Sequence, residues 1–454
     1  ETYENPGTPN IPPVGPGENR FSPKSQFTSP ATKVSLPSSN DSKSSRNEEK
    51  RNPKKDFETM VDFYLANNPY LKTNGKESEL EIRFGTNKKL GKPLSKIEYD
   101  NIIKQFYSAG FQTEEPEGMH MLRISNQFTN QDGYVVMSRT RAEIAGMDLI
   151  EEYCRTNSLP KILEMPSTST AQGDKIKFTK KEFPLVGGRE NGKHLQPVDF
   201  EDFNFRVSYQ HETDISVREN LARRILSTWN DSKKTFRYIN RVRFAHPDFP
   251  VFLDVSIVKN SAKVNGKVSI PQYTIQEAKL FDSPEEYEVE LEIDNSRVGP
   301  GTNYSKVAPL LKDIRKTIRI VLSGMQGTSY PISFSERDTI HQHYMLLLHG
   351  EEYVKDLLNN ENKFKKRIIP RDFVGPSSNT LQLENIQPVD PENEIATSVP
   401  NIRDNYTVTD KADGERRLLY VSPSGRLYMI DSNMNVIFTG TFTNNKEHYN
   451  TMID

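Results

Sequence analysis

The feature that most constrains this chain is the stretch EYEVELEID at residues 286–294, in which acidic and apolar residues alternate. Successive side chains of a β-strand point to opposite faces, so the stretch predicts a strand with one acidic and one apolar face. A single strand of this kind is usually an edge strand with its polar side in water. Five aligned carboxylates nevertheless raise one another's pKa unless a cation lies among them.

A second strand of the same kind lies near the start of the ordered sequence. ELEIRF places Glu79, Glu81 and Arg83 on one side and three apolar residues on the other. Mg²⁺ and Mn²⁺ prefer carboxylate oxygens and water as ligands. Two acidic strand faces therefore make a divalent-metal site a reasonable hypothesis.

Other alternating stretches carry basic residues. TFRYINRVRF sets Arg237, Arg241 and Arg243 on one face, FNFRVSYQ offers Arg206, and VFLDVSIV turns Asp254 away from its apolar neighbours. Further basic positions in such stretches are Arg139, Arg141, Lys175, Lys177 and Lys181. Each stretch alone is typical of a solvated surface. If the apolar faces pack outward, however, the charged faces converge inside a barrel, where metal, arginines and a water-orienting carboxylate would suit a triphosphate.

The pattern along the chain predicts an α+β protein with four parts. Residues 1–55 have the composition of a disordered tail, 56–330 are rich in strands, 331–375 form a helical connector, and 376–454 begin another strand-rich part. About eight strands suggest a closed barrel or a sandwich. The predicted strands are 79–85, 133–143, 174–183, 203–210, 235–245, 250–258, 271–281 and 286–294. Helices are predicted at 304–324 and 335–359.

The two acidic strands resemble the signatures of triphosphate tunnel metalloenzymes, specifically the metal-dependent RNA triphosphatases of fungi and large DNA viruses. The resemblance implies an eight-stranded antiparallel tunnel with flanking helices that hydrolyses the γ-phosphate of RNA ends. It implies Mg²⁺ or Mn²⁺ as the metal, and leaves open whether Glu288 or Glu290 is the catalytic residue that activates water. The implied metal ligands are Glu79, Glu81, Glu290 and Glu292, the implied phosphate ligands are Arg83, Arg206, Arg241 and Arg243, and Asp254 would support them.

The hexapeptide KADGER at 411–416 is the second motif. A nucleophilic lysine needs nearby cations or desolvation to lower its pKa, and Lys411 has two arginines close by in sequence. The motif resembles the Lys-x-Asp-Gly-x-Arg motif of covalent nucleotidyltransferases, which include mRNA guanylyltransferases and polynucleotide ligases. That resemblance implies a lysyl-GMP intermediate on Lys411, with GTP as donor and with Asp413, Gly414 and Arg416 at the nucleotide.

The order of the two motifs resembles the multifunctional mRNA capping enzymes of poxviruses, asfarviruses and mimivirus-like viruses. Residues 376–454 would then be the truncated beginning of the guanylyltransferase domain. The implied partners are RNA with 5′-triphosphate and 5′-diphosphate ends, GTP, a methyltransferase domain or subunit, and RNA polymerase. The implied location is the host cytoplasm or the virion. The lone cysteine, Cys154, suits a reducing compartment, and no apolar run approaches the roughly 18 residues of a membrane span.

Three alternatives remain open from the sequence. A tunnel phosphatase could act on free nucleotides or polyphosphate, although KADGER argues against it. A polynucleotide ligase would explain KADGER but leave the acidic strands unexplained. The third alternative is a β-rich RNA-binding module without enzymatic activity, in which the acidic strands are ordinary solvent-exposed faces.

Overall fold

The computed structural model describes residues 52–72, 75–86, 93–165, 175–186, 192–264, 268–359, 368–374, 380–388, 392, 399–403, 405–408, 410 and 414–453. Most of the predicted tail therefore lies outside the described residues. A helix begins at Pro53, so residues 53–55 are helical and do not belong to a tail. Within the described ranges, no helix is both long and apolar enough to cross a membrane.

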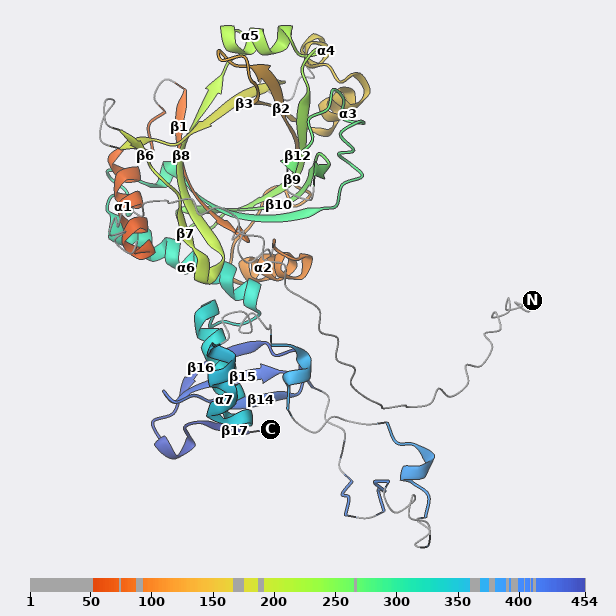
Figure 1. Cartoon of the computed structure of the whole chain (residues 1–454). Helices are drawn as coiled ribbons and strands as arrows, with labels where there is room; N and C mark the ends of the chain where they lie inside the picture. Colours follow the sequence, from red (N-terminus) through yellow and green to blue (C-terminus); the bar gives the residue numbers. More distant parts are fainter. Residues whose placement is uncertain are drawn as a thin grey trace, which may run out of the picture. The chain divides into compact units, whose positions relative to one another are not determined.

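Eight antiparallel strands close into a barrel, as Figure 1 shows. Going around the wall, the order is β1, β13, β10, β9, β2, β3, β4 and β8, and β1 pairs with β8 to complete the ring. The short strand β7 (Val198–Phe200) extends the sheet beside β8. The barrel strands are β1 (Lys76–Phe84), β2 (Met119–Thr129), β3 (Val135–Ala145), β4 (Lys177–Glu182), β8 (Phe205–Ile215), β9 (Lys234–Phe244), β10 (Val251–Asn260) and β13 (Glu286–Ile293).

The apolar faces of these strands point outward and form two hydrophobic clusters. Leu80 and Ile82 of β1 and Leu291 of β13 belong to the first cluster, whereas Leu122 and Ile124 of β2 belong to the second. All five side chains are fully buried. Because side chains alternate along a strand, the charged residues between them face the lumen. The predicted closed barrel with outward apolar faces is thus confirmed.

Helices cover both clusters on the outside of the barrel (Figure 1). The first cluster includes residues of α1 (Pro53–Ala66), α2 (Lys96–Ser108) and α6 (Val307–Gln326). The second includes residues of α3 (Met147–Thr156), α4 (Leu159–Glu164) and α5 (Asn220–Ser227). The ends of these helices follow local sequence signals: Ser95 and Glu98 form a capping box on α2, and Gly327 ends α6 in the left-handed conformation.

Seven of the eight predicted strands coincide with strands of the barrel, and one prediction is wrong. Residues 271–281 form turns that place Ile275, Ala278 and Leu280 in the second cluster. The side chain of Asn157 accepts a 2.8 Å hydrogen bond from the Ile275 amide and holds this segment in place. The eighth barrel strand is instead β2, which the sequence analysis missed because only Leu122 and Ile124 mark its apolar face.

The C-terminal part pairs a long helix with a small sheet. The predicted helices at 304–324 and 335–359 correspond to α6 and to α7 (Phe334–Asn359), and α7 is broken at Gly350. The sheet has the order β16, β15, β14, β17, and Tyr344 of α7 packs in one cluster with its apolar residues. Its strands are β14 (Arg417–Val421), β15 (Arg426–Asp431), β16 (Val436–Phe442) and β17 (Thr451–Ile453).

Short elements complete the described structure. Two small hairpins are formed by β5 (Leu185–Val186) with β6 (Lys193–His194) and by β11 (Lys263–Val264) with β12 (Val268–Ser269). Single 3₁₀ turns occur at Glu201–Phe203, Asn295–Arg297, Pro370–Asp372, Leu383–Asn385 and Lys446–His448.

Helices α2 and α6 approach each other closely at Gly324. A Cβ atom at this position would lie 2.6 Å from the Ile102 Cα atom and 2.8 Å from its amide nitrogen. These are backbone atoms, so the contact could be relieved only by moving one helix away from the other. Gly324 is therefore required by helix packing, although glycine weakens a helix by roughly 1 kcal/mol relative to alanine.

We expect Gly324→Ala to lower the free energy of unfolding by about 1–3 kcal/mol, because overpacking a closed contact forces the backbone to shift. Chemical denaturation followed by circular dichroism measures the change. Lys312→Ala, at an exposed position of the same helix, is the control and should alter stability by less than about 0.5 kcal/mol. A Gly324→Ala protein as stable as the wild type would contradict the packing argument.

Candidate active site

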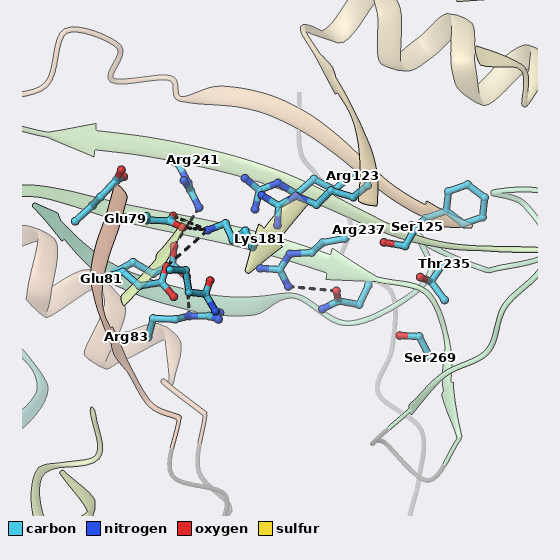
Figure 2. A pocket seen from close by; sticks show the side chains of 16 residues that line it. Glu79, Glu81, Arg83, Arg123, Ser125, Lys181, Thr235, Arg237, Arg241 and Ser269 are labelled. Atoms are coloured by element: carbon cyan, nitrogen blue, oxygen red, sulfur yellow. Dashed lines mark hydrogen bonds and ion pairs between the residues drawn. The ribbon is translucent and has the colours of Figure 1, made fainter. Parts of the chain in front are cut away.

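The barrel encloses a cavity of about 410 Å³ that is lined mostly by charged side chains (Figure 2). Acidic and basic groups both face it, and most of the barrel strands contribute at least one. The charged residues are Glu79, Glu81, Arg83, Arg123, Arg141, Lys181, Arg237, Arg241, Glu290 and Glu292. A cavity of this composition suits a small polyanion together with a cation, not an apolar ligand.

The pairing of β1 with β13 brings the two acidic motifs face to face. Glu81 lies opposite Glu292, and Arg83 lies opposite Glu290. Residues directly opposite each other in an antiparallel pair project from the same face of the sheet. The register therefore places three carboxylates and one guanidinium on one patch of the cavity wall, and Glu79 extends this patch along β1.

Lys181 lies among the carboxylates of β1. Its ammonium forms an ion pair with Glu79 and lies 3.9 Å from a carboxylate oxygen of Glu81 and 3.6 Å from one of Glu212 (Figure 2). The hydroxyl of Ser208 donates a 2.9 Å hydrogen bond to Glu81. Burial nevertheless raises the pKa of Glu81, and the neighbouring carboxylates of Glu79 and Glu290 raise it further. Burial and neighbouring carboxylates thus outweigh the effect of Lys181 and Arg83 on Glu81.

Glu290 and Glu292 lie on the same strand but differ in their electrostatic surroundings. Burial alone would raise the pKa of Glu290, but Arg83, at 2.8 Å, and Arg241, at 3.1 Å, hold it well below its usual range. Burial raises the pKa of Glu292 to about 7, because its ion pair with Arg243 does not offset burial and nearby carboxylates. Glu290 is therefore ionised at neutral pH, and Glu292 is sensitive to an added cation.

Asp254 supports the arginines from behind the cavity surface. Its carboxylate lies 3.0 Å from Arg241 and 2.7 Å from Arg243, and it is buried. Neither Asp254 nor Arg243 lines the cavity itself. Glu288 also lies off the cavity, where it pairs with Arg237 and lies 3.8 Å from Arg83.

The structure does not place Arg206 on the cavity. This residue was predicted to bind phosphate, and it does lie opposite Arg83 in the barrel wall. It also lies opposite Asp199 of β7, however, and donates hydrogen bonds of 2.7 and 2.9 Å to that carboxylate. The short strand β7, which the alternation pattern did not reveal, supplies the ion-pair partner of Arg206, and Arg206 is not among the residues that line the cavity.

Several cavity residues were not selected as site residues from the sequence. Arg123 was missed with its whole strand, and the alternation of Arg123 and Ser125 with Leu122 and Ile124 is the signal that could have found it. Arg141, Lys181 and Arg237 were noticed as basic positions, but their strands carry no distinctive motif.

Glu143, outside the cavity lining, joins two of the arginines. Its carboxylate lies 3.2 Å from Arg123 and 2.5 Å from Arg141, and the hydroxyl of Thr179 donates a 2.9 Å hydrogen bond to it. Burial would raise the pKa of Glu143, but the two guanidiniums lower it to about 2. This carboxylate is therefore fully ionised and fixes the two arginines in the wall.

The donor chemistry of the acidic patch fits a hard divalent cation, because carboxylate oxygens are the ligands such ions prefer. Burial and neighbouring carboxylates raise the pKa values of Glu81 and Glu292, so a cation bound beside them would favour their ionised forms. In the described part of the chain, however, no three His, Cys, Asp or Glu side chains already surround a common metal position. Lys181 holds Glu79 and lies near Glu81, so a metal would have to displace its ammonium.

The second motif lies only partly within the described structure. Lys411 and Asp413 fall outside the described residues, so their predicted roles are not addressed by the coordinates. Gly414 is described, and the guanidinium of Arg416 lies over the ring of Phe373, 5.8 Å from its centre. Strand β14 begins at Arg417, directly after the motif.

The sequence is similar to the probable mRNA-capping enzyme of Acanthamoeba polyphaga mimivirus, with 28% identity over 370 residues. The matched region covers 80% of this chain but only 23% of that protein, so the chain spans about a quarter of the relative's length. No protein-family model matches the chain.

Solved structures with some likeness to this chain include two crystal structures of the mimivirus capping enzyme triphosphatase. They share 16% identity with this chain, cover 58% of it, and give TM-scores of 0.34 and 0.33, covering 97% and 96% of the solved chains. The S. pombe Pct1 RNA triphosphatase, solved in complex with the Spt5 CTD, has 12% identity and a TM-score of 0.30 over 60% of this chain and 93% of its own. In sequence, this chain is thus similar to part of a probable mimivirus mRNA-capping enzyme.

Proposed function

We propose that the barrel is an RNA 5′-triphosphatase that acts in mRNA capping. The observation that carries this proposal is the cavity wall formed by β1 and β13, where Glu79, Glu81, Glu290 and Glu292 face arginines and Lys181 inside a closed barrel. A triphosphate needs both kinds of group, because a metal held by carboxylates and a set of guanidiniums share the neutralisation of its charge. The sequence similarity to an mRNA-capping enzyme points to RNA as the substrate.

The metal in this proposal is Mg²⁺ or Mn²⁺. Glu79, Glu81 and Glu292 are the residues that would hold it, and Lys181 would turn from Glu79 toward Glu212, which already lies 3.6 Å away. When bound, such an ion supplies positive charge to the phosphate oxygens and favours charge development in the transition state. The remaining residues of the wall bind and orient the substrate.

The proposed reaction is attack of a water oxygen on the γ-phosphorus and cleavage of its bond to the β,γ-bridging oxygen, which leaves inorganic phosphate and diphosphate-ended RNA. Arg83 and Arg241 would neutralise the charge on the transferred group. Glu290 lines the cavity and remains ionised, so it can accept a hydrogen bond from the attacking water. Glu288, the other candidate, does not line the cavity and contacts Arg83 and Arg237, which favours Glu290 for this role.

A second proposed activity concerns KADGER. Lys411 would attack the α-phosphorus of GTP, release pyrophosphate and carry GMP to the diphosphate end that the barrel produces. The observation in its favour is the motif itself, followed at once by β14. Asp413, Gly414 and Arg416 would contact the nucleotide, and a methyltransferase and RNA polymerase are partners expected of such an enzyme in the host cytoplasm or virion.

We expect Glu81→Gln and Glu292→Gln each to slow phosphate release from γ-labelled triphosphate RNA at least a hundredfold, because the cation site loses a charged ligand. The matched control is Glu286→Gln on the same face of β13, since Glu286 pairs with Lys263 and does not line the cavity. It should stay within about twofold of the wild type. Release that is indifferent to Glu81 and Glu292 would leave the RNA-binding module as the better interpretation.

We expect Lys181→Met to tighten binding of Mn²⁺ in the absence of RNA, because the methionine removes an ammonium that competes for Glu79 and Glu81. The change should be severalfold and is measured by electron paramagnetic resonance of free Mn²⁺. The double variant Glu79→Gln, Glu81→Gln should abolish the same binding. Equal Mn²⁺ affinity in all three proteins would place the metal elsewhere.

We expect the full-length protein to retain labelled GMP after denaturation when it is incubated with α-labelled GTP and Mg²⁺, and Lys411→Ala to retain none. The wild-type adduct should be stable to alkali and labile to acid, as is typical of a phosphoramide bond. Labelling by ATP in place of GTP would favour the polynucleotide ligase alternative.

A further inference from the structure

The cavity has two chemically different ends. Figure 2 shows Glu79 and Glu81 at one side of the view and Ser125, Thr235 and Ser269 at the other, with Arg123 and Arg237 between them. The carboxylate end is accounted for by the proposed hydrolysis of the γ-phosphate. The hydroxyl end has no role in that chemistry, although its side chains line the same cavity.

The hydroxyl groups at the two ends differ in their hydrogen bonds. On the carboxylate side, Ser208 donates to Glu81 at 2.9 Å, and Ser256 accepts from Arg241 at 3.3 Å. At the other end, the hydroxyls of Ser125 and Thr235 have no hydrogen-bond partner among the described residues, and both face the cavity. These two residues lie directly opposite each other on β2 and β9. Their side chains therefore form a pair of adjacent polar groups that is available to a ligand.

Arg123 lies next to this pair, and its positive charge is neutralised by a carboxylate that it shares with Arg141. Arg123 is mostly buried, and its Nε atom lies 3.2 Å from the Glu143 carboxylate without the geometry of a hydrogen bond. Its ion-pair partner within the described residues is Glu143, at 3.2 Å, and Arg141 shares that carboxylate at 2.5 Å. The nearby guanidiniums of Arg141, Arg237 and Arg241 add to burial in lowering the pKa of Arg123. Arg123, Arg141 and Arg237 thus bring three guanidiniums to this part of the cavity wall, where they can bind an anionic group.

We propose that this end of the cavity binds the first nucleotide of the RNA, with Arg123 at its α-phosphate and the hydroxyls of Ser125 and Thr235 at its ribose. The inference rests on the proposed triphosphatase function, since it takes the γ-phosphate to lie at the carboxylate end. The order along the cavity, from carboxylates through arginines to hydroxyls, then matches the order of metal-bound phosphate, inner phosphates and sugar. The RNA chain leaves the barrel at the hydroxyl end.

The ribose 2′-hydroxyl is the group that this pair is suited to recognise. In RNA the 3′-oxygen of the first nucleotide is esterified, whereas the 2′-hydroxyl is free to donate and accept hydrogen bonds. Ser125 and Thr235 can each do the same. A tripolyphosphate has no such group, so these residues would distinguish RNA ends from inorganic polyphosphate without taking part in catalysis.

The test compares three substrates: triphosphate-ended RNA, the same oligonucleotide with a 2′-deoxy first nucleotide, and inorganic tripolyphosphate. We expect the double variant Ser125→Ala, Thr235→Val to raise KM for triphosphate-ended RNA roughly tenfold, the effect of losing one or two hydrogen bonds, with kcat little changed. Its KM for tripolyphosphate should equal that of the wild type. The wild type should prefer the ribose substrate over the deoxyribose one, and the variant should lose this preference.

Thr129→Val is the matched control, because Thr129 is an exposed residue at the end of the same β2 strand. It should leave all three KM values unchanged. An unchanged KM for RNA in the double variant, or an equal rise for RNA and tripolyphosphate, would overturn the assignment of this subsite. Failure of the wild type to hydrolyse any of the three would instead refute the proposed function. The unchanged KM for tripolyphosphate separates loss of RNA binding from misfolding, and direct titration of the same variant with fluorescent triphosphate RNA in Ca²⁺ measures the loss of binding itself.

Discussion

The structure depends on the pairing of charges inside a closed barrel. Moving a charged side chain out of water costs several kcal/mol unless a partner of opposite sign replaces the lost hydration. Closure through β1 and β8 puts every second residue of eight strands into one shared interior. The alternation that buries Leu80, Ile82 and Leu291 outside the barrel thus forces carboxylates and guanidiniums together inside it. The outer core could not form without the charged lumen, because both come from the same strands.

The charged side chains of the lumen are not all neutralised equally by their ion-pair partners, and the two ends of the cavity differ in this respect. Asp254 and Glu290 are held by arginines on two sides. Glu81 and Glu292, by contrast, have raised pKa values because burial and neighbouring acids outweigh their basic partners. The opposite imbalance is the lowered pKa of Arg123, which burial and the guanidiniums of Arg141, Arg237 and Arg241 cause despite the ion pair with Glu143. A cation at one end and phosphates toward the other would remove both imbalances at once, which is the arrangement that a metal-dependent reaction on a polyphosphate requires.

The sequence predicted the fold, and it predicted which acidic residues line the cavity better than which basic residues do. EVELEI and ELEIRF alternate so strictly that strand and face follow from the pleat, whereas their mutual proximity was inferred from the metal hypothesis and the family resemblance. Residues 271–281 were wrongly predicted to be a strand, because buried turns and strands can share an apolar composition. The hydrogen bond that the Ile275 amide donates to Asn157 is a tertiary contact that the local sequence does not reveal. The same limit explains Arg206 and Arg123: one is held by Asp199 of a three-residue strand, and the other lies on a strand with too few apolar residues to be recognised. Which cations face which acids depends on register, and register is fixed only when the barrel closes.

The closed wall also limits where substrate specificity can arise. Arginines and a divalent cation bind any chain of phosphates, so the middle of the cavity cannot distinguish RNA from a nucleotide or from polyphosphate. Groups that recognise a sugar must be uncharged, must face the lumen and must not be tied to neighbouring side chains. Ser125 and Thr235 line the cavity and meet these conditions within the described structure, whereas Ser208 and Ser256 do not line it and are bonded to Glu81 and Arg241. For the proposed function, selectivity for RNA over other phosphate chains must therefore come from the end of the cavity that is lined by hydroxyl groups and not by charged side chains.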